Sequence, residues 1–461
     1  MEKLKRIKSI YKEKFNIEGD ITDFAGKFSK VPGTVILLSG GDLDSSRYHI
    51  IAAKPIFEVW SYGSNIKLIE NTLIREFESY PLDFLNDLIE FFRVPFDEDI
   101  PVAAGLFGYL SYDIKDFIEV LPKTGFDKWN LPQMYFILPS IVIVHDKITS
   151  ETVLYIPVLE DMVQNEQVLN IKAFIDGLSE NKESISLSNG TGFKSSFKKD
   201  EYIKAVERIK DYILSGDIYQ ANLSQRFESD FTGCPYQLFS KLYYKNPAPF
   251  FAFINAESHF IISTSPERFI KQKGRYVESR PIKGTRRRSQ DPYEDEGLRA
   301  DLISSEKDDA ELSMIVDLMR NDIGRVCGAN SVRVKEHKRV EAYKNVYHMV
   351  SVITGDLEDN VNSIDLIKAT FPGGSITGCP KIRSMEIIGE LEKYKRHVYT
   401  GSIGYISFHD TMDFSVAIRT ATVFNNRIAF SVGGGIVFDS IPEDEFAETL
   451  HKGKSFFDVF I

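Results

Sequence analysis

One lysine of the chain lies in a sequence that could support nucleophilic chemistry. Lys283 sits between Pro281 and Gly284 in the run Ser279-Arg280-Pro281-Ile282-Lys283-Gly284-Thr285-Arg286. Because proline fixes a backbone dihedral and glycine lets the chain bend close to a ligand, the run predicts a stiff turn. Burial, or a cationic neighbour such as Arg280 or Arg286, would lower the pKa of the lysine and activate it. The alternative is a surface turn with a solvated lysine.

Two acidic helix patterns could supply ligands for a hard cation. The segment Ser304–Val326 carries a helical apolar stripe, and the segment Pro442–Phe457 opens with a proline followed by acids, as helices often do. The acids that share a face are Asp308 and Glu311 on the first segment, and Glu445 and Glu448 on the second, together with Lys452. If the two helices meet, these carboxylates could bind one Mg²⁺. Ordinary solvated helix faces are the alternative.

Two glycine-rich runs could bring the backbone close to a small ligand. The run Phe371–Lys381 includes Thr377 and precedes an expected helix over Ile382–Tyr394, so its N–H groups could hold an anion. It is not a P-loop, because its lysine is displaced and no serine or threonine follows it. The second run, Ser431–Val437, contains Gly433, Gly434 and Gly435 between expected strands. Turns also use glycine, so neither run is specific by itself.

Four isolated polar residues lie beside apolar strand patterns. They are Glu267, His348, Tyr399 and Arg419. An arginine in a strand of small apolar residues needs a partner, and a substrate carboxylate could bind it through two hydrogen bonds. A single histidine or glutamate in such a place is more often structural.

Composition narrows the class of protein. The 461 residues are 43% hydrophobic, which allows a large core, and the net charge of −11 argues against a nucleic-acid or anionic-membrane surface. Three cysteines (Cys234, Cys327 and Cys379) are too few and too widely spaced for a disulfide framework, so we expect a reducing cytoplasm. We find no signal-peptide pattern and no membrane-spanning apolar run.

The elements needed to position these residues divide the chain in two. Strands are expected over Thr34–Leu38, Tyr48–Ala52, Ile66–Leu68, Met134–His145 and Thr152–Val158, with helices over Leu82–Phe92 and Lys199–Ser215. The Ser/Asn/Gly-rich stretch 184–198 is the best linker candidate. We therefore expect an N-terminal region, 1–183, that contributes strands to the body, then this surface linker, then a catalytic region, 199–461.

Several runs together resemble the chorismate-utilising enzymes, a family that includes anthranilate, aminodeoxychorismate, isochorismate and salicylate synthases. The runs that carry the resemblance are Ser263–Phe269, Pro281–Thr285, Asp317–Arg325, Phe371–Lys381 and Glu445–Thr449, with weaker matches at Arg47–Ile50 and Gly105–Tyr109. The resemblance implies an α+β fold in which two large, mostly antiparallel sheets pack as a sandwich, with helices outside and the site in a cleft between the sheets.

The resemblance also implies roles for individual residues. Glu267 would be the general acid for the C4 hydroxyl of chorismate, and His348 would lie near C4. Mg²⁺ would be held by Glu311 and Glu448, with Asp308 and Glu445 nearby. Asp308 departs from a glutamate common at its position, which favours a less direct role. The substrate would be bound by Tyr399, Arg419, Gly433, Gly434, Gly435, Lys452, Thr377 and Gln220.

Two positions distinguish the members of this family. Gln220 stands where the water-using members have a lysine base, which disfavours isochorismate and salicylate synthesis. Lys283 stands where anthranilate synthases have a small residue and the large subunits of aminodeoxychorismate synthases have lysine. The chain therefore resembles the latter, which make 4-amino-4-deoxychorismate for para-aminobenzoate and folate. Anthranilate synthase component I is the alternative, and a scaffold without activity is disfavoured.

The resemblance implies partners as well. Chorismate and ammonia would be the substrates, and because the chain has no Gly-x-Cys-x-Gly nucleophile, a separate glutamine amidotransferase subunit would supply the ammonia. Some relatives bind tryptophan in the N-terminal half. The run Leu37-Leu38-Ser39-Gly40-Gly41 departs from their Leu-Leu-Glu-Ser pattern, which leaves an amino-acid pocket there open.

Overall fold

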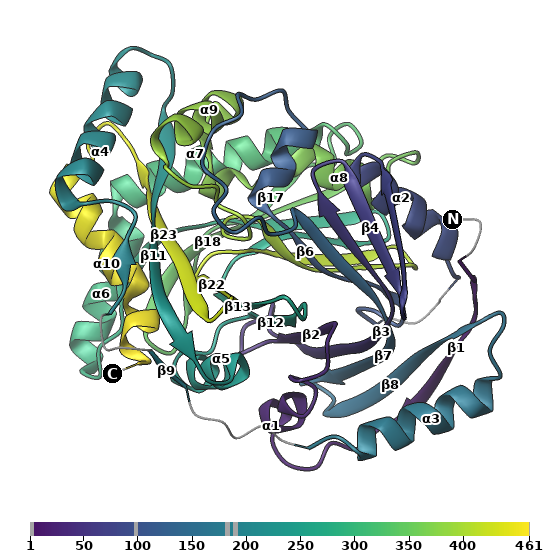
Figure 1. Cartoon of the computed structure of the whole chain (residues 1–461). Coiled ribbons are helices and arrows are strands. Elements are labelled where there is room, and N and C mark those ends of the chain that lie inside the picture. Colours follow the sequence, from purple (N-terminus) through teal and green to yellow (C-terminus); the bar gives the residue numbers. More distant parts are fainter. Residues whose placement is uncertain (1–3, 96–99, 180–184, 188–191, 461) are drawn as a thin grey trace.

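The computed structural model describes residues 4–95, 100–179, 185–187 and 192–460. Antiparallel strands form two large layers, and helices cover the outer faces of both (Figure 1). The predicted α+β sandwich is confirmed.

The first layer contains the strands nearest the chain termini. Its hydrogen-bonded order is β1 (Ile7–Lys14), β8 (Glu151–Leu159), β7 (Met134–Asp146), β3 (Tyr48–Tyr62), β2 (Thr34–Leu38), β12 (Phe250–Asn255), β13 (His259–Ser265), β22 (Thr420–Phe424), β23 (Arg427–Ile436) and β11 (Gln220–Thr232). Three short strands also pair with β11, namely β9 (Ser186–Leu187), β10 (Lys194–Ser195) and β19 (Gly378–Cys379).

The second layer uses the other ends of β3 and β7. Its order is β5 (Leu73–Glu78), β4 (Asn65–Glu70), β3, β7, β6 (Gly105–Leu110), β20 (Ser402–Ser407), β21 (Thr411–Val416), β14 (Arg268–Lys273), β15 (Tyr276–Arg280) and β18 (Val346–Asp356). Two further strands, β16 (Ile282–Arg287) and β17 (Arg333–Ala342), pair with β18.

The long strands β3 and β7 belong to both layers. The first part of β3 pairs with β2, and its last part pairs with β4. Between these parts Lys54 has a φ of +55°, and the β3–β7 register shifts between Pro55 and Phe57. A bulge of this kind bends a strand, which allows one continuous ribbon to enter two sheets.

Alternating side chains build the core on both faces of the second layer. In β6, Phe107 and Tyr109 pack between the layers with residues of β2, β12 and β20, whereas Leu106 and Leu110 face the opposite core, which includes residues of α2 and α7. Successive strand residues point to opposite faces. Every residue of β6 is buried, because the strand has a core on each side.

The helices lie outside these layers. They are α1 (Ile21–Gly26), α2 (Pro81–Phe92), α3 (Gln164–Asp176), α4 (Lys199–Leu214), α5 (Pro235–Lys245), α6 (Pro292–Ser304), α7 (Glu306–Gly324), α8 (Ser363–Thr370), α9 (Lys381–Leu391) and α10 (Pro442–Asp458). In Figure 1, α7, α8 and α9 lie above the sheets, and α1, α3 and α5 lie below them. No helix within the described ranges is both long enough and apolar enough to span a membrane.

The expected division of the chain remains a prediction. Strands from the first 183 residues lie within both layers. In the stretch 184–198, residues 184 and 188–191 lie outside the described residues, and β9 and β10 pair with β11.

Candidate active site

The site lies where two chain segments cross from one layer to the other. Pro266 and Glu267 connect β13 in the first layer to β14 in the second, and residues 417–419 connect β21 to β22. The crossings are joined by backbone hydrogen bonds from Thr264 N to Arg419 O (3.0 Å) and from Val416 N to Glu267 O (3.0 Å). Arg419 has a φ of +50° and lies between strands, so its predicted place within a strand is wrong.

Lys283 lies in a strand and not in the predicted turn. The β16–β18 register shifts between Lys283 and Thr285, and Gly284 has a φ of +79°. This is a bulge of the kind that uses glycine and re-aims a neighbouring side chain. The Lys283 side chain is only 11% exposed, and its Nζ lies 3.8 Å from Glu311 Oε2.

The pKa of Lys283 is lowered, as predicted, but the two arginines are not the cause. Burial is the main cause, and the positive charge of Lys452 adds to it, while Glu311 opposes the shift. Arg280 instead pairs with Glu278 and Asp44, and Arg286 with Asp301 and Asp308, so the predicted role of these arginines is wrong. A buried amine with a lowered pKa has a larger unprotonated, nucleophilic fraction.

Glu267 has the properties of a general acid. It is 4% exposed, and burial raises the pKa of its carboxyl group to about 7, although a hydrogen bond with Ser375 and the charges of Lys283 and Arg419 act in the opposite direction. A carboxyl group with a pKa close to neutrality can carry and release a proton at physiological pH.

His348 is buried on β18 beside the bulge. Its Nδ1 lies 2.8 Å from Thr285 Oγ1, and its ring packs edge-on against Tyr343. Burial and the charge of Arg419 lower its pKa to about 3, so the ring is neutral at pH 7. Its Nε2 is buried and has no hydrogen-bond partner among the described residues, which leaves this atom available to a ligand.

Helices α7 and α10 contribute the predicted carboxylates. Glu448 Oε1 accepts a charged hydrogen bond from Lys452 Nζ (2.6 Å), and Lys452 also donates to Gly433 O (3.0 Å). Glu445 accepts from Ser440 (2.6 Å). Because the charges of Glu311 and Glu448 both act on Lys283, the two helices face the same amine.

The carboxylates have the chemistry of a Mg²⁺ site, but lysine and arginine side chains lie against them in this structure. Glu311 and Glu448 offer hard oxygen donors, the type that Mg²⁺ takes together with substrate and water. Lysines lie beside both, and Asp308 pairs with Arg286 at 3.0 Å. Among the described residues, no three His, Cys, Asp or Glu side chains are gathered as a ready metal cage. This donor set fits one or two protein ligands and a substrate carboxylate.

The second glycine run lines the site as a bare backbone. A Cβ added to Gly435 would lie 2.2 Å from Gln220 Nε2 and 3.2 Å from Lys283 Nζ. A Cβ on Gly434 would lie 3.2 Å from Glu445 Oε2 and 3.7 Å from Glu448 Oε1. A side chain at Gly434 or Gly435 would therefore occupy the space between the predicted catalytic groups.

Strand β11 presents unpartnered amides to the same space. Gln220 is fully buried, and neither atom of its amide has a hydrogen-bond partner within the described part of the chain. The same holds for Oδ1 of Asn222, a residue that the sequence analysis missed. The period-two spacing from Gln220 could have identified Asn222. Buried polar atoms are normally satisfied, so these amides mark a place for a polar ligand.

In the first glycine run, Phe371–Lys381, the amine of Lys381 is not placed to bind an anion. Lys381 donates to Asp322 and to Thr370 O (2.9 Å), which keeps its amine at the base of the loop. Thr377 Oγ1 donates to Gly373 O (2.9 Å), and Thr377 O accepts from Asn222 N (2.7 Å). The loop is thus tied to β11 beside the unpartnered amides.

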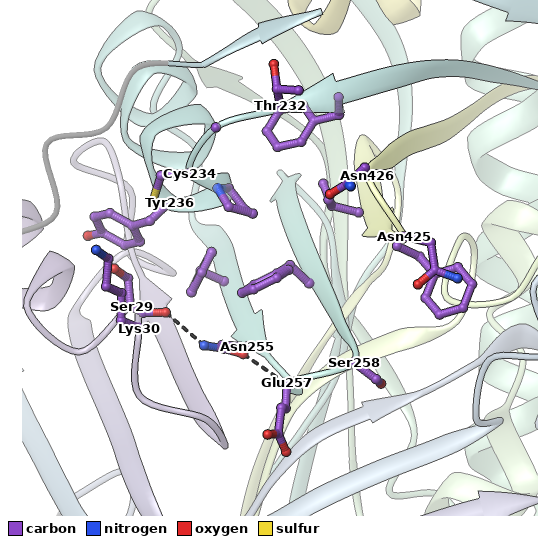
Figure 2. Close-up of a pocket in the computed structure, with 17 residues that line it drawn as sticks. Ser29, Lys30, Thr232, Cys234, Tyr236, Asn255, Glu257, Ser258, Asn425 and Asn426 are labelled. Atoms are coloured by element: carbon purple, nitrogen blue, oxygen red, sulfur yellow. Dashed lines mark hydrogen bonds between the residues drawn. The ribbon is translucent and has the colours of Figure 1, made fainter. Parts of the chain in front are cut away.

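Two other hollows lie outside this group of residues. A cavity of about 260 Å³ is lined by residues of β2, β3, β12, β14, β20 and β21, including Leu37, Ser39 and Tyr48. The cavity includes part of the run Leu37–Gly41, and the possible amino-acid pocket there stays a prediction. Figure 2 shows an open hollow of about 560 Å³, with Ser29, Asn255 and Asn426 among its walls.

Known proteins resemble the chain over nearly its full length. A model of the family described as chorismate binding enzyme matches residues 39–458. Aminodeoxychorismate synthase component 1 of Escherichia coli is 38% identical over 435 residues, covering 93% of each chain. Anthranilate synthase component 1 of Aquifex aeolicus is 36% identical over 429 residues, covering 90% of this chain and 84% of its own.

Solved structures agree with these matches. Anthranilate synthase component I of Streptococcus pneumoniae is superimposable with a TM-score of 0.79 at 31% identity, covering 90% of this chain and 93% of its own. The isochorismate synthase MenF of Escherichia coli shares the fold, with a TM-score of 0.76 at 15% identity over 98% of this chain and 94% of its own. The predicted family is confirmed: the chain is a chorismate-utilising enzyme and belongs to the chorismate binding enzyme family.

Proposed function

We propose that the chain is component I of an aminodeoxychorismate synthase, which converts chorismate and ammonia to 4-amino-4-deoxychorismate for para-aminobenzoate and folate synthesis. The observation that carries this proposal is the environment of Lys283. Its amine is buried, has a lowered pKa and lies next to the bare backbone of Gly435 and the acid Glu267. A lysine with a purely structural role does not need this combination.

Amination at C4 explains why a nucleophilic lysine is useful. Direct allylic attack by ammonia enters at C2 and leads toward anthranilate. In the proposed path, the Lys283 amine forms a bond to C2, both double bonds of the ring diene shift by one position, and the C4–O bond breaks. Glu267 gives its proton to the departing oxygen, which leaves as water. Ammonia then bonds to C4, both double bonds shift back, and the C2–N bond breaks to release Lys283, while Glu267 accepts the surplus proton.

The remaining groups bind and orient the substrate. Glu311 and Glu448 would hold Mg²⁺, which when bound neutralises the C1 carboxylate and draws electron density from the ring. Arg419 can pair with a carboxylate because its planar guanidinium group donates two parallel hydrogen bonds, and the negative charge of a bound carboxylate would oppose the burial that lowers the pKa of this arginine. Neutral His348 would place its free Nε2 near C4, and Gln220 would contact the incoming groups.

Anthranilate synthase component I is the second candidate. The relatives keep this candidate in place, because they are divided between the two activities at similar identity. The identity is 36% for the anthranilate synthase component of Aquifex aeolicus and 38% for the aminodeoxychorismate synthase component of Escherichia coli. The two reactions differ in the carbon that receives nitrogen, so the product distinguishes them. In either case the component 1 names of the relatives support a separate amidotransferase subunit as the ammonia source.

The deciding experiment is a product analysis. Purified chain is incubated with chorismate, ammonium and Mg²⁺, and the products are separated by chromatography against 4-amino and 2-amino standards. We expect the 4-amino product with ammonium and no turnover with glutamine alone. Formation of anthranilate would refute the aminodeoxychorismate synthase assignment, and glutamine-dependent turnover by the pure chain would refute the need for a partner.

A further inference from the structure

A buried ion pair lies behind the predicted substrate-binding residues. The Arg396 and Glu392 side chains are 3% and 7% exposed. Arg396 donates from Nε to Glu392 Oε2 (2.8 Å) and from Nη2 to Glu392 Oε1 (2.7 Å). This two-point contact fixes the plane of the guanidinium group as well as its position.

The other N–H groups of Arg396 tie three separate segments together. Nη1 donates to Ile376 O (3.1 Å) and Thr400 Oγ1 (3.3 Å), and Nη2 donates to Asn222 O (2.8 Å). With the two bonds to Glu392, all five donors of the guanidinium group have acceptors. Arg396 is therefore a rigid junction between β11, the first glycine run and the segment that follows α9.

Each segment held by this junction carries a predicted substrate-binding residue. Ile376 precedes Thr377, Thr400 follows Tyr399, and Asn222 lies opposite Gly435 in the β11–β23 pair. The bonds of Arg396 go to backbone or neighbouring atoms, so Arg396 itself does not occupy the predicted binding side chains.

Glu392 extends the junction to Tyr399. Its Oε1 accepts from both N and Oγ of Ser224 (2.8 Å each), and Ser224 is hydrogen-bonded to the Tyr399 side chain. The Arg396 guanidinium group also lies 5.8 Å from the centre of the Tyr399 ring. Burial raises the pKa of Tyr399, so its hydroxyl stays neutral and can donate to a carboxylate.

We propose that Glu392 and Arg396 are positioning residues for chorismate binding. They hold Tyr399, Thr377 and the Gly433–Gly435 backbone at fixed separations, so that the substrate carboxylates meet a pre-formed set of donors. This inference rests on the proposed function in taking those residues as the chorismate contacts. A buried ion pair is weak evidence of a stabilising role, because apolar residues can often replace such a pair without loss of folding stability. The geometry of this pair instead indicates a role in positioning the substrate-binding residues.

The test compares Glu392→Gln and Arg396→Lys with a control variant. Glu228→Gln removes a carboxylate from β11, the strand that Arg396 contacts through Asn222 O. Glu228 is also buried (8% exposed) and pairs with Arg226 (2.9 Å), Lys128 (2.8 Å) and Arg427 (2.9 Å). The substitution perturbs a comparable ion-pair cluster outside the proposed site. For each protein, KM for chorismate, kcat and Tm are measured with ammonium and Mg²⁺.

We expect KM for chorismate to rise about tenfold to a hundredfold in both site variants, with a much smaller change in kcat. Arg396→Lys keeps the charge but not the planar fork, so it should not restore KM. Glu228→Gln should lower Tm and leave KM unchanged. The proposal is overturned if KM in Arg396→Lys stays within twofold of wild type, or if Glu228→Gln raises KM equally. Because KM is measured whichever product forms, a 2-amino product would refute the proposed function without deciding this test.

Discussion

The two walls of the site are built differently and carry charge differently. The strand wall, with Glu267, Lys283 and His348, is buried, and burial shifts all three pKa values toward the neutral forms. The helix wall, on α7 and α10, is open only at Glu448, whose side chain is 51% exposed, whereas Glu311 is 16% exposed and Glu445 is buried. Burial there would raise the pKa of Glu448, but Lys452 lowers it overall, so the carboxylate stays charged.

This difference indicates a division of tasks between the walls. Groups that must gain or lose protons lie on strands or, for Glu267, on the crossing between two strands, where burial is the main cause of their pKa shifts. Groups that would hold a cation lie on helix faces, and at Glu448 the charge of Lys452 keeps the carboxylate ionised. Substitutions on each wall test this division.

Glu448→Ala should have the largest effect. Removing one of two carboxylates from the helix wall should lower kcat/KM by about 10⁴-fold, because a metal ion supplies several kcal/mol of charge stabilisation. The measurement is kcat/KM over a Mg²⁺ titration, with Glu443→Ala, an exposed acid in the first turn of α10, as the control. Full activity of Glu448→Ala in the presence of EDTA would show that the helix wall does not hold a metal.

Glu267→Gln should lower kcat by about 10³-fold, within the usual range for general acid–base catalysis. Glutamine keeps the shape of the side chain but cannot give a proton, so KM for chorismate should change little. Steady-state kinetics with ammonium provide the measurement. A loss in kcat of less than about threefold would exclude Glu267 as the general acid and would contradict the assignment of proton transfer to the strand wall.

Lys283→Ala should lower the rate by about 10²-fold and change the product. Without the positioned amine, ammonia must act by diffusion, and the vacated space lets it attack C2. Chromatography should then show the 2-amino product in place of the 4-amino one. Lys283→Arg should also be poor, since guanidinium stays protonated. An unchanged product in Lys283→Ala would mean that the lysine is a bystander.

The pH dependence should give the smallest effect. Because the acid form of Glu267 is required and its pKa is about 7, kcat/KM should fall about tenfold per pH unit above pH 7, and Glu267→Gln should lack this limb. The raised pKa also means that the folded chain binds more protons than the unfolded chain. Glu267 should therefore lower the stability as pH rises from about 4.5 to 7, and Glu267→Gln should flatten that slope in a Tm–pH series.

Helices and the residue types of the site could be predicted from the sequence more accurately than the local backbone geometry could. Helices α7 and α10 followed from apolar periodicity and their acidic faces. The setting of Lys283 was mistaken, because a bulge and a turn both use glycine and only strand pairing distinguishes them. Arg419 lies between apolar strands, so its left-handed conformation has no signal in the local pattern.

Long-range contacts account for the rest. The sequence offered two causes for the Lys283 pKa shift and could not choose between them, because burial depends on the whole fold. Arg280 and Arg286 are neighbours in sequence but bond elsewhere. Asn222 could have been found from strand alternation. The role inferred for Arg396 required the positions of three segments that are far apart in the sequence.

The passage of β3 and β7 through both layers bears on how the protein could be divided or engineered. A fragment starting at Lys199 would leave β12 without β2 and β20 without β6, exposing two long apolar sheet edges. Such edges promote aggregation. Co-expressed halves, in contrast, could pair along the same edges and restore the sandwich. The activity of split halves would thus depend on reassembly, and exchange of an N-terminal half between relatives would succeed only where these edge strands keep their register.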